Sequence, residues 1–291
     1  MEGTRGSARN RPRELSFPYN RPMPELPEVE TIARGVNERL RGDRIVEVWF
    51  GGHREPFKTP PARQAKGLEG RAILAVHRTG KHIVCELKPA AQWIVHLGMT
   101  GRLLVTTPEA SVAPHTHARL SLASGRELRF VDPRRFGRLE FRDLSRGNGF
   151  SAAGADPLEV TAEEFVTLFH TRRLAIKAAL LNQKLLSGVG NIYADESLFR
   201  AGIRPRRPSA RLSRAELERL RLSLAAVLEH AIQLGGSSVS DYVDADGVRG
   251  FFQLEHCVYM RTGLACRRCQ TPIRRIILAG RGTHYCPKCQ V

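Results

Sequence analysis

The chain has 291 residues, of which 42% are hydrophobic, and this is enough for two domains with a substantial core. Its 46 lysines and arginines outnumber 29 acidic residues, which gives a formal charge of +17 and a pI near 10.5. So large a positive charge favours a polyanionic partner, most simply a nucleic acid, with an anionic membrane surface as the alternative. No apolar run approaches the ~20 residues that a membrane-spanning helix needs.

Residues 1–22 differ in composition from the rest of the chain. They carry five arginines and two glutamates, and no hydrophobic run long enough for a secretory signal. An arginine-rich targeting leader is the alternative, but the segment lacks an amphipathic pattern. We therefore expect residues 1–22 to form a disordered extension that is not part of the working protein.

The segment PEVETIARGVNERLRG, residues 27–42, has the pattern of an amphipathic helix. Its apolar positions recur every three or four residues, with acidic residues in the first turn and arginines in the last. Short apolar runs follow, and their glycine and proline punctuation indicates a β-sandwich or barrel rather than βαβ units. The predicted strands cover residues 44–50, 72–78, 82–87, 92–97, 101–107, 118–123 and 127–132.

The pattern becomes helical after the glycine-rich stretch GNGFSAAG. Thr161 with Glu164, and Ser213 with Glu216, have capping-box spacing ahead of apolar helices. Between these helices, residues 175–203 indicate a helix, a glycine-containing turn and a second helix. The sequence therefore predicts an α+β fold with an N-terminal β-sandwich domain at residues 23–152, a helical domain at 153–256 and a zinc finger at 257–291.

Two C-x-x-C pairs lie near the C-terminus and are separated by sixteen residues. This spacing is typical of a four-cysteine zinc site, and the intervening segment has the pattern of a β-hairpin. Four thiolates leave no open position for water, so we predict one structural Zn²⁺ rather than a reacting metal. Two redox-active pairs are the alternative, but no thioredoxin-like βαβ pattern surrounds them. The predicted ligands are Cys266, Cys269, Cys286 and Cys289.

The stretch SGVGN contains a turn whose backbone amides can point outward just ahead of a helix. Gly188 and Gly190 leave the approach open, and Asn191 can cap the helix or donate to an anion. An ordinary helix connection is the alternative reading of this segment. The high positive charge of the chain favours a phosphate-binding turn.

Five motifs occur in an order and spacing that resemble one known family. They are MPELPEVETI, HLGMTG, DPRRFG, GVGNIYADE and the terminal four-cysteine hairpin. On these motifs, residues 23–291 resemble the bacterial formamidopyrimidine-DNA glycosylases. The stretch PELPEVE favours this branch over the related endonuclease VIII, whose first residues usually read closer to PEGPE. The resemblance implies an N-terminal helix with a β-sandwich, a helix-two-turn-helix domain and a zinc finger.

The resemblance implies base-excision repair: removal of 8-oxoguanine and formamidopyrimidines from duplex DNA, followed by cleavage at the abasic site. It makes Pro24 the nucleophile, a secondary amine that attacks the sugar C1′ and forms a Schiff base. It makes Glu25 a proton donor, and it assigns Lys81 and Arg281 as proton donors in β- and δ-elimination. Without the family, Glu25 would be read as a helix N-terminal charge and the other two as exposed cations.

The resemblance also implies a set of residues that enter or grip the duplex. Met99 fills the void left by the flipped base, Arg134 faces the orphaned cytosine and Phe136 wedges the stack. The remaining implied DNA contacts are His115, Asn191 and Arg172. The neighbouring Arg173 is an alternative to Arg172.

The implied partner is double-stranded DNA, with no membrane and no cofactor beyond zinc. Because members of this family work as monomers, the resemblance implies a monomer that works in the bacterial cytoplasm, at the nucleoid. Two alternatives stay open: an endonuclease VIII-like enzyme for oxidised pyrimidines, and a damage-binding protein without catalysis.

A nucleophilic Pro24 requires a free nitrogen. In the written chain that nitrogen is a tertiary amide to Met23 and has no basic lone pair. We expect translation to start at Met23 and this methionine to be removed. If residues 1–22 are retained, the non-catalytic alternative is favoured.

Overall fold

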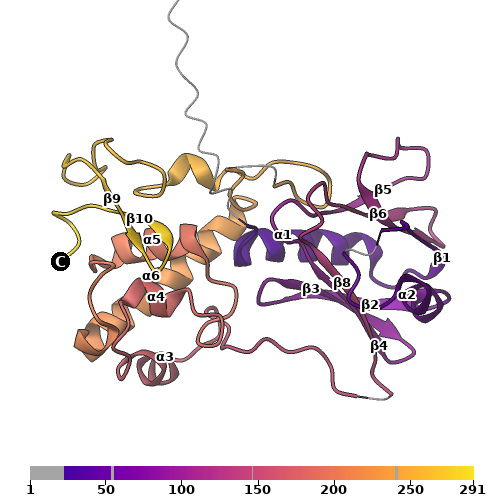
Figure 1. Ribbon diagram of the computed structural model, residues 1–291, viewed down its shortest axis with the longest axis horizontal. Coiled ribbons are helices and arrows are strands. Elements are labelled where there is room, and N and C mark those ends of the chain that lie inside the picture. The colour runs from indigo at the N-terminus through magenta and orange to yellow at the C-terminus, as the bar shows by residue number, and fades with distance from the viewer. Residues whose placement is uncertain (1–22, 54–55, 146, 240–241) are drawn as a thin grey trace, which may run out of the picture.

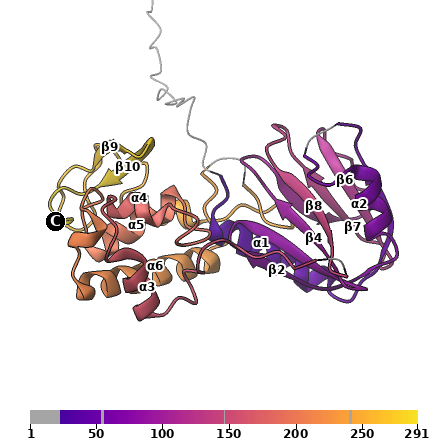
Figure 2. The same cartoon turned by 60° about the horizontal axis from the view of Figure 1, so that its bottom comes forward.

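The computed structural model describes residues 23–53, 56–145, 147–239 and 242–291. The disorder predicted for residues 1–22 therefore concerns a segment outside the described residues. Two bodies lie side by side, a β-rich one from the first half of the chain and a helical one from the second (Figures 1 and 2). This confirms the predicted α+β class. None of the helices in the described ranges is long and apolar enough to cross a membrane.

The β-rich body consists of helix α1 (Leu26–Leu40) and two four-stranded antiparallel sheets. One sheet has the strand order β1-β6-β7-β5 and the other the order β2-β3-β4-β8. The apolar face of α1 is buried against the core that these strands form, as its periodicity predicted. The strands are β1 (Ile45–Phe50), β2 (Ala72–Thr79), β3 (His82–Lys88), β4 (Ala91–His96), β5 (Arg102–Thr106), β6 (Thr116–Leu122), β7 (Glu127–Val131) and β8 (Arg138–Asp143).

Two elements of this body were not predicted from the sequence. Strand β8 reads RLEFRD, and only Leu139 in it is fully buried, so charged residues conceal the alternation. Helix α2 (Pro61–Leu68) buries only Gln64 and Leu68, which leaves no apolar stripe to detect.

The helical body contains α3 (Ala162–Phe169), α4 (Ile176–Leu180), α5 (Asn191–Ala201) and α6 (Arg214–Gln233). Both predicted capping boxes are confirmed: the hydroxyl of Thr161 accepts from the Glu164 amide, and Ser213 accepts from the Glu216 amide. The apolar stripe of α6 is buried in the core of this body. Two short 3₁₀ turns, Ser209–Arg211 and Phe252–Glu255, flank α6.

The C-terminal segment contains the predicted hairpin between the cysteine pairs, formed by β9 (Arg274–Leu278) and β10 (Arg281–Tyr285). Its two-residue loop, Ala279 and Gly280, has φ values of 48° and 71°. Two successive positive φ angles are the geometry of a type I′ turn, which matches the twist of the flanking strands. Arg281 therefore stands at the tip of a well-defined hairpin.

The two bodies exchange residues where they meet. Leu26, the first residue of α1, is buried in the helical core. In return, Tyr242 and Ala245 from the segment after α6 are buried in the core of the β-rich body. The Ala245 carbonyl also accepts a 2.9 Å hydrogen bond from the Val105 amide of β5. This exchange fixes the start of α1 at the junction of the two bodies.

Candidate active site

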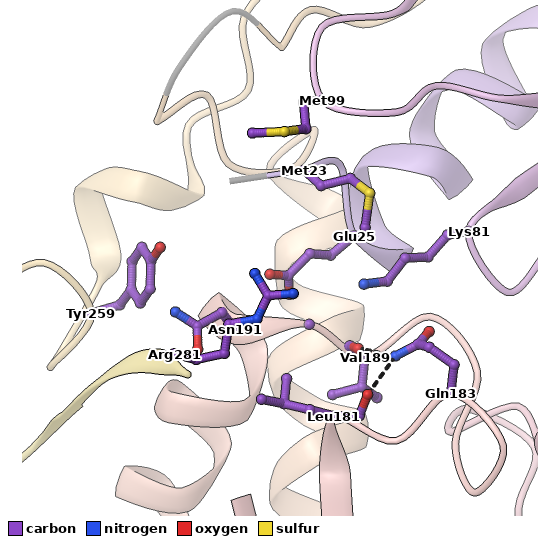
Figure 3. A pocket seen from close by; sticks show the side chains of 11 residues that line it. Met23, Glu25, Lys81, Met99, Leu181, Gln183, Val189, Asn191, Tyr259 and Arg281 are labelled. Atoms are coloured by element: carbon purple, nitrogen blue, oxygen red, sulfur yellow. Dashed lines mark hydrogen bonds between the residues drawn. The ribbon is translucent and has the colours of Figure 1, made fainter. Parts of the chain in front are cut away.

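A cavity of about 280 Å³ lies at this junction, beside the start of α1 (Figure 3). Five predicted site residues that are far apart in the sequence line it: Glu25, Lys81, Met99, Asn191 and Arg281. Tyr259 also lines the cavity, although no sequence signal pointed to it. The ammonium of Lys81 and the guanidinium of Arg281 point into the same space as the Glu25 carboxyl group (Figure 3).

The Glu25 side chain crosses from the β-rich body to the N-terminus of α5. Its carboxyl oxygens accept hydrogen bonds from the backbone amides of Ile192, at 3.0 Å, and Tyr193, at 3.4 Å. These amides have no partner within the helix, and the positive end of the helix dipole favours an acidic group. Glu25 is only 3% exposed.

Burial is the largest influence on Glu25 and raises its pKa to about 7. The positive charge of Lys81 and the two amide hydrogen bonds act in the opposite direction, while the neighbouring Glu28 raises the pKa further. A carboxyl group with a pKa near 7 holds a proton in a useful fraction of molecules at neutral pH. It can therefore act as a general acid.

Gly190, the N-cap residue of α5, is required by the position of Glu25. A Cβ atom at Gly190 would lie 2.2 Å from the Glu25 carboxyl carbon. We expect Gly190→Ala to displace Glu25 from the helix N-terminus and to lower base excision by about 10²-fold or more, the effect of losing a general acid. Single-turnover kinetics checks this. A matched Gly147→Ala change, at a glycine without a positive φ where a Cβ would meet nothing within 4 Å, should leave the rate within about twofold.

Lys81 is carried by the tight turn between β2 and β3, where Gly80 has a φ of 61°. Burial lowers the pKa of Lys81, and the positive charge of Arg281 lowers it further. The nearby carboxylates of Glu25 and Glu28 raise it again. An amine that is less basic than an ordinary lysine exchanges protons more readily near neutral pH.

Arg281 reaches the cavity from the hairpin tip, and Asn191 fixes this hairpin against α5. The Asn191 side-chain amide donates a 3.0 Å hydrogen bond to the Gly282 carbonyl. Of the two roles that the sequence allowed for Asn191, the structure excludes capping, because Asn191 is the first residue of α5 and Gly190 is the cap. The buried Lys177 donates to the same carbonyl, at 3.1 Å, which adds a second attachment.

The remaining predicted site residues lie around the cavity or outside it. Met23 lines the cavity, and Pro24, to whose nitrogen it is bonded, is buried. The Arg134 guanidinium stacks 4.6 Å from the centre of the Phe136 ring, and that ring is 45% exposed. Both residues, together with the exposed His115 and Arg172, are absent from the cavity lining.

Glu28 is a buried part of the site that sequence reasoning treated only as a first-turn charge. It accepts hydrogen bonds from the Glu25 amide at 2.9 Å, the Ser237 amide at 2.7 Å and the Tyr193 hydroxyl. Burial raises its pKa. Its carboxylate ties α1, α5 and the segment after α6 together behind Glu25. The Glu25-x-x-Glu28 spacing is the sequence signal that could have indicated it.

The four predicted metal ligands are brought together by the two ends of the hairpin. Their sulfur atoms all lie within 4.8 Å of one another, with Cys269–Cys286 at 3.4 Å and Cys266–Cys289 at 3.9 Å. A tetrahedral site with metal–sulfur bonds of about 2.3 Å has sulfur–sulfur edges of about 3.8 Å, so the cluster fits a structural metal. Backbone amides of Arg268 and Cys289 also donate to the sulfurs.

Comparisons with known proteins now decide the family. The N-terminal domain model of formamidopyrimidine-DNA glycosylase matches residues 23–139, and its H2TH domain model matches residues 153–243. A zinc finger found in FPG and IleRS matches residues 263–291. The chain belongs to the formamidopyrimidine-DNA glycosylase family. The resemblance seen in the sequence is thus confirmed.

Curated members of this glycosylase family are similar over most of their length. The enzyme of Solibacter usitatus is 44% identical over 268 residues, covering 92% of this chain and 99% of that protein. Among solved structures, a mutant of Lactococcus lactis FPG in complex with DNA containing Fapy-dG has a TM-score of 0.83 at 33% identity, and the match covers 92% of this chain and 99% of that chain. Thermus thermophilus FPG has a TM-score of 0.79 at 40% identity, with 92% and 98% covered.

The metal site allows a direct test. We expect Cys286→Ser to lose the bound metal and to weaken DNA binding by about tenfold or more, because the hairpin that carries Arg281 loses its anchor. Metal content by mass spectrometry and DNA affinity by fluorescence anisotropy measure both effects. Cys257→Ser is the matched control, since Cys257 is a free thiol outside the four-cysteine cluster. One metal per chain retained in Cys286→Ser would contradict the expectation.

Proposed function

We propose that this protein excises oxidised purines from duplex DNA and then cleaves the abasic site through a Schiff base on Pro24. The observation that carries the proposal is the buried carboxyl group of Glu25, with a pKa near 7, in a cavity shared with Lys81 and Arg281. Membership of the glycosylase family supports the base-excision reaction. Lactococcus lactis FPG is known in complexes with DNA that contains Fapy-dG or an abasic site, which supports duplex DNA as the partner.

The reaction begins with the Pro24 nitrogen, whose lone pair attacks C1′ of the damaged nucleotide. A free α-amine has a pKa of roughly 8, so a useful neutral fraction exists at physiological pH. The bond from C1′ to the base breaks, and the base leaves with its electron pair and takes up the proton that the Pro24 nitrogen loses on bonding to C1′. Glu25 donates a proton to the opening sugar ring, and the nitrogen and C1′ become an iminium ion.

The iminium ion acidifies the hydrogens on C2′, and this drives strand cleavage. Removal of one C2′ proton breaks the bond to the 3′ phosphate, and a second elimination releases the 5′ phosphate. Lys81, with its lowered pKa, is positioned to transfer protons in the first elimination. Arg281 also lines the cavity, and its guanidinium can donate hydrogen bonds to the departing 5′ phosphate in the second elimination.

The DNA-facing roles belong to the same proposal. Met99 lines the cavity that the flipped nucleotide would enter, and it would fill the vacated stack. The exposed Phe136 ring, with Arg134 stacked on it, has the apolar surface that a wedge between bases needs. His115, Arg172 and Asn191 would contact phosphates.

The chain's own charge and thiol chemistry support the remaining assignments. A net charge of +17 suits the phosphate backbone of DNA, and binding should weaken steeply with salt. Four cysteine sulfurs at tetrahedral spacing favour Zn²⁺, which would hold the hairpin and take no part in the chemistry. A DNA-repair enzyme of a bacterial family would work as a monomer in the cytoplasm, at the nucleoid.

Borohydride trapping on two lesions tests the proposal. Reduction of the iminium ion leaves a covalent protein–DNA adduct, which we expect with 8-oxoguanine opposite cytosine at a rate at least about tenfold above that with thymine glycol. The reverse preference would favour the pyrimidine alternative, for which a Lactococcus lactis FPG complex with oxidised-pyrimidine DNA is a precedent. No adduct on either lesion, from protein whose first residue is Pro24, would leave only damage binding.

A further inference from the structure

Asp132 is a fully buried carboxylate placed directly after β7, at the meeting point of the loops that carry the proposed DNA-facing residues. We propose that Asp132 is the positioning residue that holds Met99, Arg134 and Phe136 in register for entry into the duplex. The inference rests on the proposed function, because it explains how residues assigned to DNA are held in place.

The side chain of Asp132 joins two separate loops. Its Oδ1 atom accepts from the Thr100 hydroxyl at 2.5 Å and from the Arg134 amide at 3.3 Å. Its Oδ2 atom accepts a 2.8 Å hydrogen bond from the Gly137 amide. Thr100 follows Met99 in the chain, and the other two donors enclose Phe136. A single carboxylate therefore links the turn that carries the methionine to the loop that carries the wedge.

The backbone of Asp132 extends this network to a third loop. Its amide donates a 3.0 Å hydrogen bond to the carbonyl of His115. Its own carbonyl is 3.0 Å from Nε2 of the buried His117. Each polar group of Asp132 thus has a partner, and the partners belong to the segments that present Met99, Phe136 and His115.

These loops need a strong attachment because their backbones are unfavourable on their own. His115 and Arg135 have φ values of 65° and 57°, in the left-handed region that residues other than glycine rarely adopt. The loops also touch backbone to backbone: a Cβ atom at Gly98 would lie 2.5 Å from the carbonyl carbon of Phe136. Charge-assisted hydrogen bonds to a buried carboxylate offset the cost of this arrangement.

Asp132 does not touch the reacting atoms. It is 0% exposed and does not line the cavity that holds Glu25 and Lys81. Its loss should therefore impair the insertion of the wedge and leave the chemistry of an already exposed sugar intact. This separation gives a readout that general destabilisation would not produce.

The test compares two substrates for Asp132→Asn. Asparagine has nearly the same shape as aspartate, but an NH₂ group replaces one of the two carboxylate oxygens. This group cannot accept the hydrogen bonds that the replaced oxygen accepts. We expect base excision from duplex DNA with 8-oxoguanine opposite cytosine to fall by about tenfold or more. Adduct formation with a preformed abasic site in single-stranded DNA, which needs no wedge, should stay within about twofold of the unsubstituted enzyme.

Three further variants sharpen the test. Thr100→Val removes one of the three side-chain hydrogen bonds and should show a smaller loss on the duplex alone. Glu86→Gln, a partly buried carboxylate on β3 that accepts from Gln92, is the matched control and should affect neither substrate. In a Met99→Ala background, Asp132→Asn should cost less than in the parent, because part of what it positions is already missing.

Equal losses on both substrates would overturn the inference, as would an unchanged rate on the duplex. A parent enzyme that forms no adduct with either substrate would instead contradict the proposed function. The two failures are therefore distinguishable.

Discussion

The full 291-residue chain is expected to form at least about 100-fold less borohydride-stable adduct than a chain that begins at Pro24. In the longer chain the nitrogen of Pro24 is an amide, so its lone pair is delocalised and it cannot form an iminium ion with C1′. Glu25, Lys81 and Arg281 are present in both versions, so a difference between them isolates the nucleophile. Trapping on a preformed abasic site, with intact masses confirmed beforehand, measures it.

The control for this comparison is binding without chemistry. Both versions should bind a tetrahydrofuran abasic analogue, which lacks the C1′ oxygen that the reaction needs. A chain that begins at residue 24 and carries Pro24→Gly supplies a primary amine in the same place. Its adduct should form more slowly than that of the chain beginning at Pro24, but faster than that of the full chain. If the full chain, with its mass unchanged, traps as fast as the shorter one, then Pro24 is not the nucleophile.

The parts of the fold that could be predicted from the sequence are those whose signal is local. Helices α3 and α6 begin at capping boxes because a serine or threonine and a glutamate three residues later satisfy backbone amides without help from the rest of the chain. The cysteine pairs are equally local, since each occupies one tight turn. Strand β8 and helix α2 were not predicted, because the burial of their side chains depends on partners that are distant in the sequence.

The candidate site divides in the same way. The family resemblance assigned roles to Glu25, Lys81 and Arg281, but the residues themselves gave no sign that the three would share a cavity. The raised pKa of Glu25 comes mainly from burial, which follows from the packing of the two bodies. Glu28 and Asp132 lie within two of the five motifs, but the motifs do not show what these carboxylates hold, because their hydrogen-bond partners lie up to 209 and 32 residues away. Such contacts appear only once the chain is folded.

Glu25→Gln is expected to lower base excision by about 10² to 10⁴-fold, the range for loss of a general acid. The parent enzyme should also slow at alkaline pH as Glu25, with a pKa of about 7, loses its proton. At acidic pH it should slow because the Pro24 amine becomes protonated. In Glu25→Gln the alkaline fall should be absent, while the acidic one remains. Single-turnover base release by both proteins, measured between pH 5 and 9, separates the acidic fall in rate from the alkaline one.

The same substitution should raise stability at alkaline pH. The pKa of Glu25 is higher in the folded protein, about 7, than its ordinary value of 4.5, so the folded state binds a proton more tightly than the unfolded state does. The resulting stability is fully present below pH 4.5 and is lost as pH rises through 7, a loss of about 3 kcal/mol at ~1.4 kcal/mol per pH unit. Glutamine has no proton to lose, so the variant escapes this loss.

Thermal unfolding of both proteins between pH 4.5 and 8.5 measures this difference. The two melting temperatures should converge at low pH, and the variant should melt several degrees higher at pH 8.5. Parallel curves would contradict the raised pKa, even if the kinetic effect were found. The pH dependence of base release and that of the melting temperature should then agree. Such agreement would mean that one proton, the one on Glu25, both limits catalysis and stabilises the fold. The site then holds Glu25 at a cost in stability, because a carboxyl group ionised in water at neutral pH could not serve as the acid.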